Sequence, residues 1–398
     1  MRTASIVIIG GGIFGANLAY VLAKRGVQDV VLLEQDTLAT GSSGKATGGL
    51  RQQFADELDI RCSVEGIRFY EQFVREYIPV ASAHQPPRFY QYGYMFLCTT
   101  PESWRNMQRI VALQQSLGVP TQLLSPAQVS ERVPQLVVDD VSGATFCPTD
   151  GYSNPGAMAR ALADAASARN VTIQEHTPVT AIQVRQGKVV GVTTPRETIA
   201  TPLVVNATGA SAALVARLAG IDDLPIWPLK RQLYLTEAVE DLPENVPMVV
   251  DLSTGFHFRR RDEGVILTLP LPVSDEQVRR NQRLEPAAFA LDLEESLWPL
   301  LHRETERRCP TLARASLKQA WAGLYEMTPD EHPILGPTAV EGFLCGCGFS
   351  GHGFMHSPWA ARLLAEFILG ETSHASELEL FSLDRFSKGK LIETTHLL

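Results

Sequence analysis

The sequence predicts an α/β protein built from two domains. Its 398 residues exceed what a single compact hydrophobic core usually holds. An apolar strand at residues 5–9, a glycine turn, an apolar helix at residues 13–24 and a second strand at residues 29–34 form the pattern of a parallel βαβ unit. Further along, strand-rich stretches interrupt helical ones. We therefore expect one discontinuous α/β domain and one discontinuous domain rich in β-sheet.

Composition excludes several classes of protein. The apolar fraction of 45% is ordinary for a globular chain. The net charge of −9 argues against nucleic acid or an anionic membrane as a partner, because both attract basic surfaces. Glycines interrupt the apolar N-terminus, so it predicts a glycine loop rather than a secretory leader, and no other run reaches the ~18 residues of a membrane span. The six cysteines follow neither a disulfide-scaffold nor a metal-ligand pattern, so we expect a cytoplasmic protein without a metal site.

The N-terminal unit carries glycines where a dinucleotide requires them. Gly10 permits the tight turn, Gly12 lets the backbone approach a pyrophosphate, and Gly15 lets the helix pack on the strand. The helix start offers free N–H groups to an anion, and Glu34 can accept hydrogen bonds from ribose hydroxyls. The unit predicts a Rossmann-type domain with the candidate contacts Gly10, Gly12, Ile13, Phe14, Gly15, Glu34 and Gln35.

A polar, glycine-rich segment at residues 40–51 follows this unit closely. A freely exchanging nicotinamide needs no second clamp of this kind, so the segment favours FAD over NAD. The alternative is a flexible surface loop. Its candidate cofactor contacts are Ser42, Ser43, Thr47, Gly48, Gly49 and Leu50.

The remaining chain alternates between the two expected domains. Residues 88–98 are predicted to form one strand rich in Tyr and Phe. Ser125 and Asn154 each precede a proline, which predicts an N-cap followed by the first turn of a helix. A final helix is expected at residues 355–369. We assign residues 1–85, 147–222 and 320–398 to the FAD-binding domain, and residues 86–146 and 223–319 to a substrate-binding domain.

Several motifs together resemble one family of flavoproteins. They are the N-terminal glycine turn, the segment ending at Arg51, and residues 150–156, 204–210, 328–337 and 348–355. On these residues the chain is similar to the D-amino-acid-oxidase-type FAD-dependent proteins over nearly its whole length. The glycine oxidase and sarcosine oxidase branch, including the β subunit of heterotetrameric sarcosine oxidase, is the part of the family it resembles.

The resemblance implies that residues 348–355 lie against the flavin. Their glycines would let the backbone pass close to a planar ring, and the helix starting near Met355 would aim its N-terminus at the pyrimidine end, where reduction gathers negative charge. His352 is either a flavin neighbour or a packed loop histidine. The resemblance adds the candidate cofactor contacts Val179, Thr208, Gly209, Gly323, Gly348, Ser350, Gly351, His352, Gly353, Phe354 and Met355.

Three positions depart from the sarcosine oxidase pattern. Gly323 stands where monomeric sarcosine oxidase has the cysteine that attaches FAD. Met355 replaces a lysine that helps to hold the substrate carboxylate, and a residue count places Ile266 at a lysine linked to oxygen activation. These departures imply non-covalent FAD, and they argue against rapid use of oxygen and against sarcosine itself as the substrate.

Four residues are candidates for the catalytic site. Arg51 matches the substrate-carboxylate arginine of the family, and a guanidinium can bind a carboxylate through two hydrogen bonds; the alternative is a surface arginine. Tyr325 matches an active-site tyrosine, with a core tyrosine as the alternative. His257 and Tyr94 fall in strands expected to cover the flavin, where a structural role is the alternative for each.

We expect an FAD-dependent oxidoreductase that oxidises the C–N bond of an amino acid or secondary amine, of the glycine, sarcosine or proline kind. Hydride would pass to flavin N5, and the resulting imine would then hydrolyse. Two alternatives stay open: a 2-hydroxy acid or polyol dehydrogenase on the same fold, and a non-catalytic flavoprotein such as an assembly factor. A partner subunit, a separate electron acceptor and a homo-oligomer also stay open beside the small-molecule substrate.

The nature of the FAD link can be tested directly. Because Gly323 has no sulfur and residues 41–49 contain no histidine, acid precipitation should release all of the flavin into the supernatant. Absorbance of the supernatant and the washed pellet measures this, and yellow colour kept by the pellet would contradict it.

Overall fold

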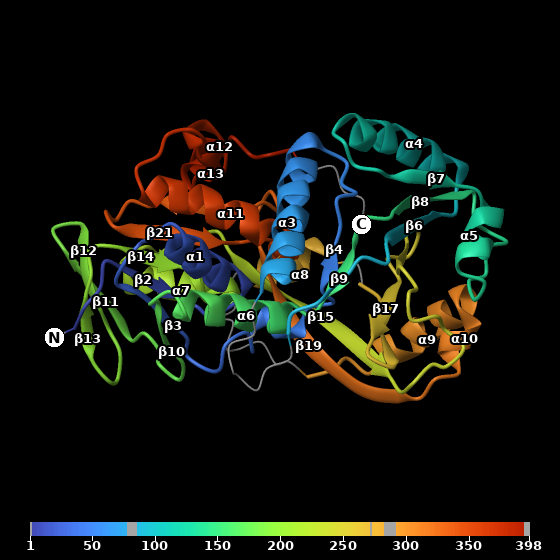
Figure 1. Cartoon of the computed structure of the whole chain (residues 1–398), viewed down its shortest axis with the longest axis horizontal. Helices are drawn as coiled ribbons and strands as arrows, with labels where there is room; N and C mark the ends of the chain where they lie inside the picture. The colour runs from blue at the N-terminus through green and yellow to red at the C-terminus, as the bar shows by residue number, and fades with distance from the viewer. Residues whose placement is uncertain (1, 78–85, 271–272, 282–291, 394–398) are drawn as a thin grey trace.

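A computed structural model describes residues 2–77, 86–270, 273–281 and 292–393. Figure 1 shows two parts side by side along the long axis. In the left part helices stack on strands, and in the right part strands dominate. Helix α3 (Glu57–Glu76) stands between them. This arrangement confirms the predicted α/β fold class with a second, sheet-rich part.

A six-stranded sheet forms the centre of the left part. Its order is β10 (Thr172–Gln174), β3 (Val30–Leu33), β2 (Ile6–Ile9), β14 (Val204–Asn206), β21 (Phe343–Cys347) and β20 (Ile334–Pro337). The first five strands are parallel, and β20 is antiparallel to β21. This is the strand arrangement of a Rossmann-type sheet, in which the first strand lies at the centre.

Both faces of this sheet are covered, so its strands are continuous apolar runs. Ile6 and Ile8 of β2 pack with α1 (Ile13–Lys24), α6 (Pro155–Ser167) and α11 (Gly353–Ile368). Val7 and Ile9 face a four-stranded sheet on the other side. That sheet has the order β1 (Arg2–Thr3), β13 (Thr198–Ala200), β12 (Lys188–Thr193) and β11 (Ala181–Arg185).

An eight-stranded, mostly antiparallel sheet forms the right part. Its order is β19 (Leu317–Met327), β15 (Trp227–Thr236), β18 (Gly264–Thr268), β17 (His257–Arg261), β16 (Met248–Asp251), β6 (Tyr94–Cys98), β8 (Gly143–Cys147) and β7 (Gln122–Leu124). Two segments distant in sequence meet where β16 pairs with β6 in parallel. The domain boundaries stay a prediction, and β19 runs through the predicted boundary at residue 320.

Helices begin where the sequence predicts them. The Ser125 side chain accepts the N–H of the third residue of α5 (Pro126–Arg132), and Asn154 does the same for α6. The last long helix, α11, begins two residues earlier than residue 355 and continues through Pro358. In the described ranges no helix is both long and apolar enough to cross a membrane.

The strand predicted over residues 88–98 is wrong as one unit. Gly93 has a φ of +88°, and a Cβ there would lie 2.1 Å from the Phe146 ring. The chain therefore turns at Gly93, so β5 (Phe89–Tyr90) joins a small sheet with β4 (Gly49–Leu50) and β9 (Gly151–Ser153), while β6 joins the large one.

A buried ion-pair network holds the far end of the large sheet. Asp251 and Arg308 have fully buried side chains and approach to 2.7 Å. Arg307 also binds Asp251, and Asp140 binds both arginines. Burial alone would raise the pKa of Asp251, but the hydrogen bond from Ser253 and the charge of Arg308 keep that pKa below its ordinary value.

Removing this carboxylate charge should destabilise the protein strongly. Asp251→Asn leaves the buried Arg308 guanidinium with only the half-exposed carboxylate of Asp140 as its anion, so we expect a loss of about 3–5 kcal/mol in the free energy of unfolding. Denaturant titration measures it. The control is Glu341→Gln, which removes an exposed pair with Lys188 and should cost at most about 1 kcal/mol. Equal losses in both variants would show that burial does not decide the effect.

Candidate active site

The turn before α1 has no room for side chains. Gly10 has a φ of +111°, and a Cβ there would lie 2.4 Å from the Ala207 carbonyl oxygen. A Cβ on Gly15 would lie 2.0 Å from the Gly10 carbonyl oxygen. Gly12 is the N-cap of α1, and its backbone is extended. Because glycine has no side chain, no capping side chain at this position occupies the N–H groups of the first helical turn. The backbone therefore approaches any ligand at the positive end of α1 closely.

Two side chains organise this turn. The Ile13 N–H donates to Ser43 Oγ at 2.9 Å, which ties the glycine-rich segment to the start of α1. Glu34 accepts from the N–H groups of Gly11 at 2.7 Å and Asp36 at 2.9 Å. Its carboxylate is thus held at the end of β3, beside the glycine turn, as the sequence predicts for a ribose ligand.

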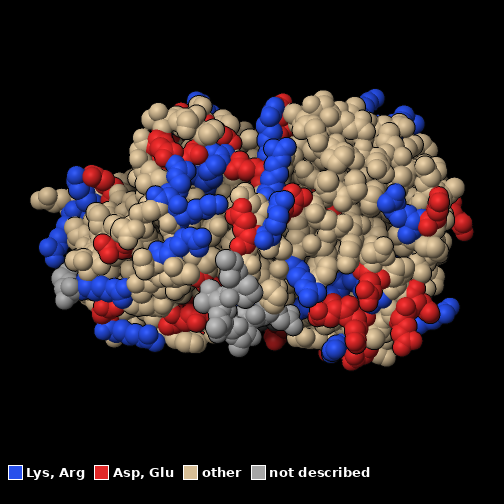
Figure 2. All heavy atoms as spheres, in the orientation of Figure 1, with Lys and Arg blue, Asp and Glu red and all other residues tan. Residues whose placement is uncertain are grey.

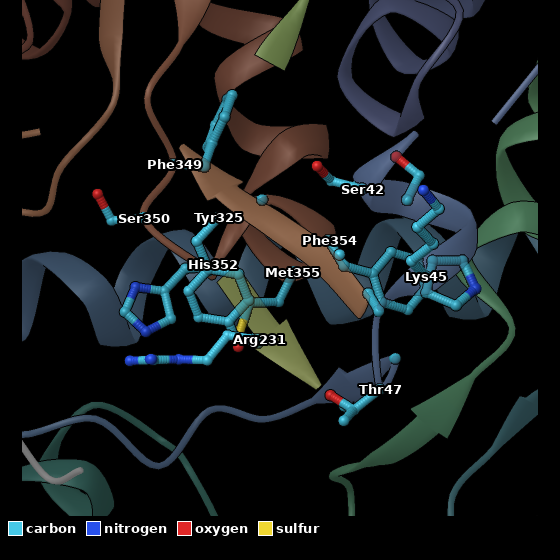
Figure 3. Close-up of a pocket in the computed structure, with 18 of the residues that line it drawn as sticks. Ser42, Lys45, Thr47, Arg231, Tyr325, Phe349, Ser350, His352, Phe354 and Met355 are labelled. Carbon is cyan, nitrogen blue, oxygen red and sulfur yellow. The ribbon is translucent and has the colours of Figure 1, made fainter. Parts of the chain in front are cut away.

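A cavity of about 330 Å³ continues from this turn toward the large sheet (Figure 3). The glycine-rich segment, β15, β17, β19 and the start of α11 all contribute to its walls. Most of the predicted site residues line it, namely Ile13, Ser42, Ser43, Thr47, Gly48, Gly49, Arg51, Tyr94, His257, Gly323, Tyr325, Ser350, Gly351, His352, Gly353, Phe354 and Met355.

Other predicted cofactor contacts do not line the cavity. Leu50 is buried in the core, and Phe14 packs on Phe349 with ring centroids 5.3 Å apart. Gln35 is exposed beyond β3, and Val179 packs on the core beneath the six-stranded sheet. Thr208 and Gly209 follow β14, and the Gly348 N–H donates to Glu326. Their contacts with a cofactor stay predictions.

Arg51 is a buried cation at the cavity wall. Only 6% of it is exposed, and its guanidinium lies 3.9 Å from the centroid of Phe54. One N–H donates to the Gln53 carbonyl at 2.6 Å. Arg308, which is also buried, has two carboxylates at hydrogen-bond distance, whereas the described residues give Arg51 none. Burial lowers the pKa of Arg51, as expected for a cation held away from water and without a counter-ion.

The histidines of the cavity are neutral. Burial, with smaller effects from the charges of Arg51 and Arg231, lowers the pKa of His257 to about 4. Its Nδ1 lies 2.8 Å from the Gly255 carbonyl oxygen, which can only accept, so Nδ1 carries the proton and Nε2 a lone pair. Burial likewise lowers the pKa of His352 to about 3 and raises that of Tyr94. Tyr94 therefore keeps its proton.

The sequence analysis missed five charged residues that line the cavity, namely Lys45, Asp59, Arg231, Glu326 and Glu331. Arg231 lies on β15, between Leu229 and Leu233 on the same face of the strand, and its guanidinium lies 5.6 Å from the centroid of Tyr325. A charge in an apolar, alternating strand was the signal that could have found it. Glu326 on β19 accepts from the Gly348 N–H at 2.9 Å. No local pattern distinguishes it from an exposed strand residue.

The positions that depart from the sarcosine oxidase pattern can now be located. Gly323 contacts Lys45, because a Cβ on Gly323 would lie 3.0 Å from the Lys45 Cβ. The Trp321 indole donates to the Lys45 carbonyl at 3.0 Å, so β19 holds the glycine-rich segment at two points. Ile266 is buried on the same face of β18 as Thr268, which lines the cavity.

The family follows from a comparison with known proteins. The model of the family described as FAD dependent oxidoreductase (DAO) matches residues 5–367. The chain belongs to this family. Among solved structures, L-proline dehydrogenase from P. horikoshii is 30% identical, with a TM-score of 0.88 over 98% of this chain and 100% of that one. Glycine oxidase from Bacillus cereus has the same fold, at 22% identity and a TM-score of 0.80 over 95% of this chain and 98% of that one.

Two curated relatives of this DAO protein are mitochondrial enzymes. Sarcosine dehydrogenase of Homo sapiens is 29% identical over 92% of this chain and 40% of its own length. Dimethylglycine dehydrogenase of Rattus norvegicus is 28% identical over 99% of this chain and 46% of its own length. The chain thus spans less than half the length of these relatives.

FAD, the cofactor of the family, fits the residues of this DAO protein. The turn at Gly10 and Gly15 excludes side chains, the α1 N-terminus can take a pyrophosphate, and Glu34 can take a ribose. At the other end, Gly351 has a φ of +97°, and a Cβ there would lie 2.6 Å from the Tyr325 ring. The missing side chain of Gly351 therefore lets the Tyr325 ring pack directly on the backbone of the loop that the sequence predicts to lie against the flavin.

Glu326 should make stability depend on pH. Burial raises its pKa from 4.5 to about 7, so the folded protein holds a proton that the unfolded chain releases. The contribution is fully present below the unfolded pKa and is lost as pH rises through the folded pKa. Glu326→Gln, which stays neutral, should be more stable than wild type by about 1–3 kcal/mol at about pH 9, with the difference vanishing near pH 5.

Thermal midpoints measured across this pH range test the effect. The matched control is Glu379→Gln, at an exposed carboxylate on α12 (Ala375–Leu380), which should follow wild type at every pH. A Glu326→Gln curve parallel to wild type would show that folding does not change the pKa of Glu326.

Proposed function

We propose that this protein oxidises the C–N bond of an amino acid or secondary amine, with the substrate carboxylate bound by Arg51. The observation that carries the proposal is a buried guanidinium without a carboxylate partner among the described residues, in the wall of the cavity that the predicted flavin loop also lines. A buried charge is costly unless it is paired, so the site favours an anionic ligand. A planar guanidinium binds a carboxylate through two hydrogen bonds.

The cavity also favours the neutral form of an amine. Arg51 and Arg231 are both positive, and a nearby like charge lowers the pKa of a bound ammonium. His257 is neutral, so its Nε2 can accept a hydrogen bond from a substrate N–H. An amine with a free lone pair can release hydride from the adjacent carbon, and bound FAD supplies the hydride acceptor.

Apolar side chains provide the remaining function of the site, which is to orient the substrate and exclude water. Leu233 and Met248 from the large sheet face the cavity, and Phe54 lies beneath Arg51. A carboxylate held at Arg51 leaves little freedom to the adjacent C–H bond within these walls. Orientation of this kind contributes more to such a reaction than acid–base catalysis by side chains.

The relatives support an N-substituted amino acid as the substrate. Sarcosine, dimethylglycine and L-proline, which name three of the relatives, are all amino acids with a secondary or tertiary amine. Ile266 on the cavity side of β18 offers no charge to activate oxygen. We therefore propose that electrons leave by an acceptor other than oxygen.

Anaerobic reduction tests the proposal. The holoprotein is mixed with pooled amino acids and N-methyl amino acids, and the flavin absorbance near 450 nm is followed. Bleaching with release of ammonia or an amine supports C–N oxidation. Bleaching by 2-hydroxy acids or polyols alone, or by none of these compounds, would overturn it.

Arg51 variants test the proposed carboxylate contact. Arg51→Ala should lower kcat/KM by roughly 150-fold, which corresponds to about 3 kcal/mol for a charged, bidentate contact. FAD occupancy should not change. Arg51→Lys keeps the positive charge but loses the planar guanidinium that makes two hydrogen bonds, so its kcat/KM should fall by a smaller factor.

The control substrate is the same amine without its carboxylate. It should be a poor substrate for wild type and should be little affected by Arg51→Ala. If both compounds lose the same factor, Arg51 acts on the cofactor or the fold, and the amino-acid assignment loses its main support.

A further inference from the structure

Arg231 lies where two cavities meet. Alternate residues of β15 face the same side, and Leu229 lines a second cavity of about 510 Å³ whereas Leu233 lines the first. Arg231, between them, lines both, as do Pro270 and Met327. A ligand that fills the first cavity and extends into the second must therefore pass the Arg231 guanidinium.

The Arg231 guanidinium has no hydrogen-bond or ion-pair partner among the described residues. Among the described residues it makes a cation–π contact with the Tyr325 ring, at 5.6 Å from the ring centroid. Two other arginines of the large sheet differ: Arg259 donates to the carbonyls of Thr47 and Ser153, and Arg260 to several carbonyls of residues 239–263. In Figure 2 basic side chains also run along the surface of α3, where water solvates them. Arg231 makes no such carbonyl contact, and it is only partly exposed at the cavity wall.

The surroundings of Arg231 are mostly apolar, and Glu331 is the carboxylate that lines both cavities with it. Trp227, Leu229, Leu252 and Met327 form apolar walls of the second cavity. Glu331 lines both cavities, and its charge raises the pKa of Arg231, while burial lowers that pKa. Figure 3 shows Arg231 below Tyr325 and beside the His352 ring, at the wall of the first cavity. The rings of Tyr325 and His352 carry no negative charge, so neither ring neutralises the Arg231 guanidinium.

We propose that Arg231 binds a second anionic group of the substrate, and that the preferred substrate is an amino acid or imino acid with two acidic groups. This inference rests on the proposed function, in which Arg51 binds the α-carboxylate. The second group lies at the junction of the two cavities. Arg231 is thus a specificity-determining residue, and the site recognises a dicarboxylate rather than a simple amino acid.

Two other roles for Arg231 predict different results. If Arg231 helps Arg51 to hold one carboxylate, its loss affects monocarboxylates and dicarboxylates alike. If it balances negative charge on the cofactor, its loss changes flavin binding and the flavin spectrum without any ligand. Discrimination between matched ligands separates the three roles.

The experiment measures binding of non-reactive acids to the holoprotein through the perturbation of its flavin spectrum, without turnover. Malonate, succinate and glutarate are compared with acetate, propanoate and butanoate, which lack the second carboxylate. At least one dicarboxylate should bind roughly 10- to 100-fold more tightly than its monocarboxylate, as a charged hydrogen bond predicts. Arg231→Gln should abolish that difference and leave monocarboxylate binding within about threefold of wild type.

The matched control is Arg261→Gln, because Arg261 lies over the Trp321 ring on the same sheet and lines neither cavity. It should behave as wild type. Equal weakening of both acid classes in Arg231→Gln, or no preference for any dicarboxylate in wild type, would overturn the inference while leaving C–N oxidation intact. Failure of every amine to bleach the flavin would instead overturn the proposed function, because the binding assay does not depend on it.

Discussion

The long antiparallel pairing of β15 with β19 determines the geometry of the site. It runs from Trp227 opposite Met327 to Thr236 opposite Leu317. Because side chains alternate along a strand, this register places Arg231 and Tyr325 on the cavity wall together. A slip of either strand by one residue would turn its own side chain, Arg231 or Tyr325, away from the cavity. The same ladder holds the glycine-rich segment through Trp321, so the large sheet and the nucleotide turn meet at one strand pair.

The buried Arg51 and the partly exposed Arg231 both line this cavity without a carboxylate at hydrogen-bond distance among the described residues. Elsewhere in the described chain the buried arginines are compensated, as Arg308 is by Asp251 and Arg385 by Asp330. Uncompensated charge at a cavity wall raises the energy of the empty site and lowers that of the loaded one, which is the arrangement expected for recognition rather than for stability.

The sequence predicts the features that depend on local chemistry. The glycines at positions 10 and 15, the carboxylate of Glu34 and the cap at Asn154 act within a few residues or within one βαβ unit, so their spacing is sufficient evidence. Arg51 was found only because it ends a motif that resembles a family.

Features that depend on distant partners could not be predicted. The break at Gly93 arises because Phe146, on another strand, occupies the space of its missing side chain. Arg231 joins the site through its pairing with β19, some ninety residues later in the chain. Glu326 becomes unusual only when the loop after β21 folds over it and supplies the Gly348 N–H. In each case the decisive neighbour is remote in sequence.

The indole of Trp321 has an optical consequence. Its N–H binds the carbonyl of Lys45, inside the segment that is expected to clamp the flavin. Indole emission overlaps the near-ultraviolet absorption band of an oxidised isoalloxazine, and energy transfer between them is efficient over tens of ångströms. The protein therefore contains a native donor beside the place where its acceptor is expected. Intrinsic fluorescence can report occupancy and redox state of that acceptor in real time, without a dye or an added label.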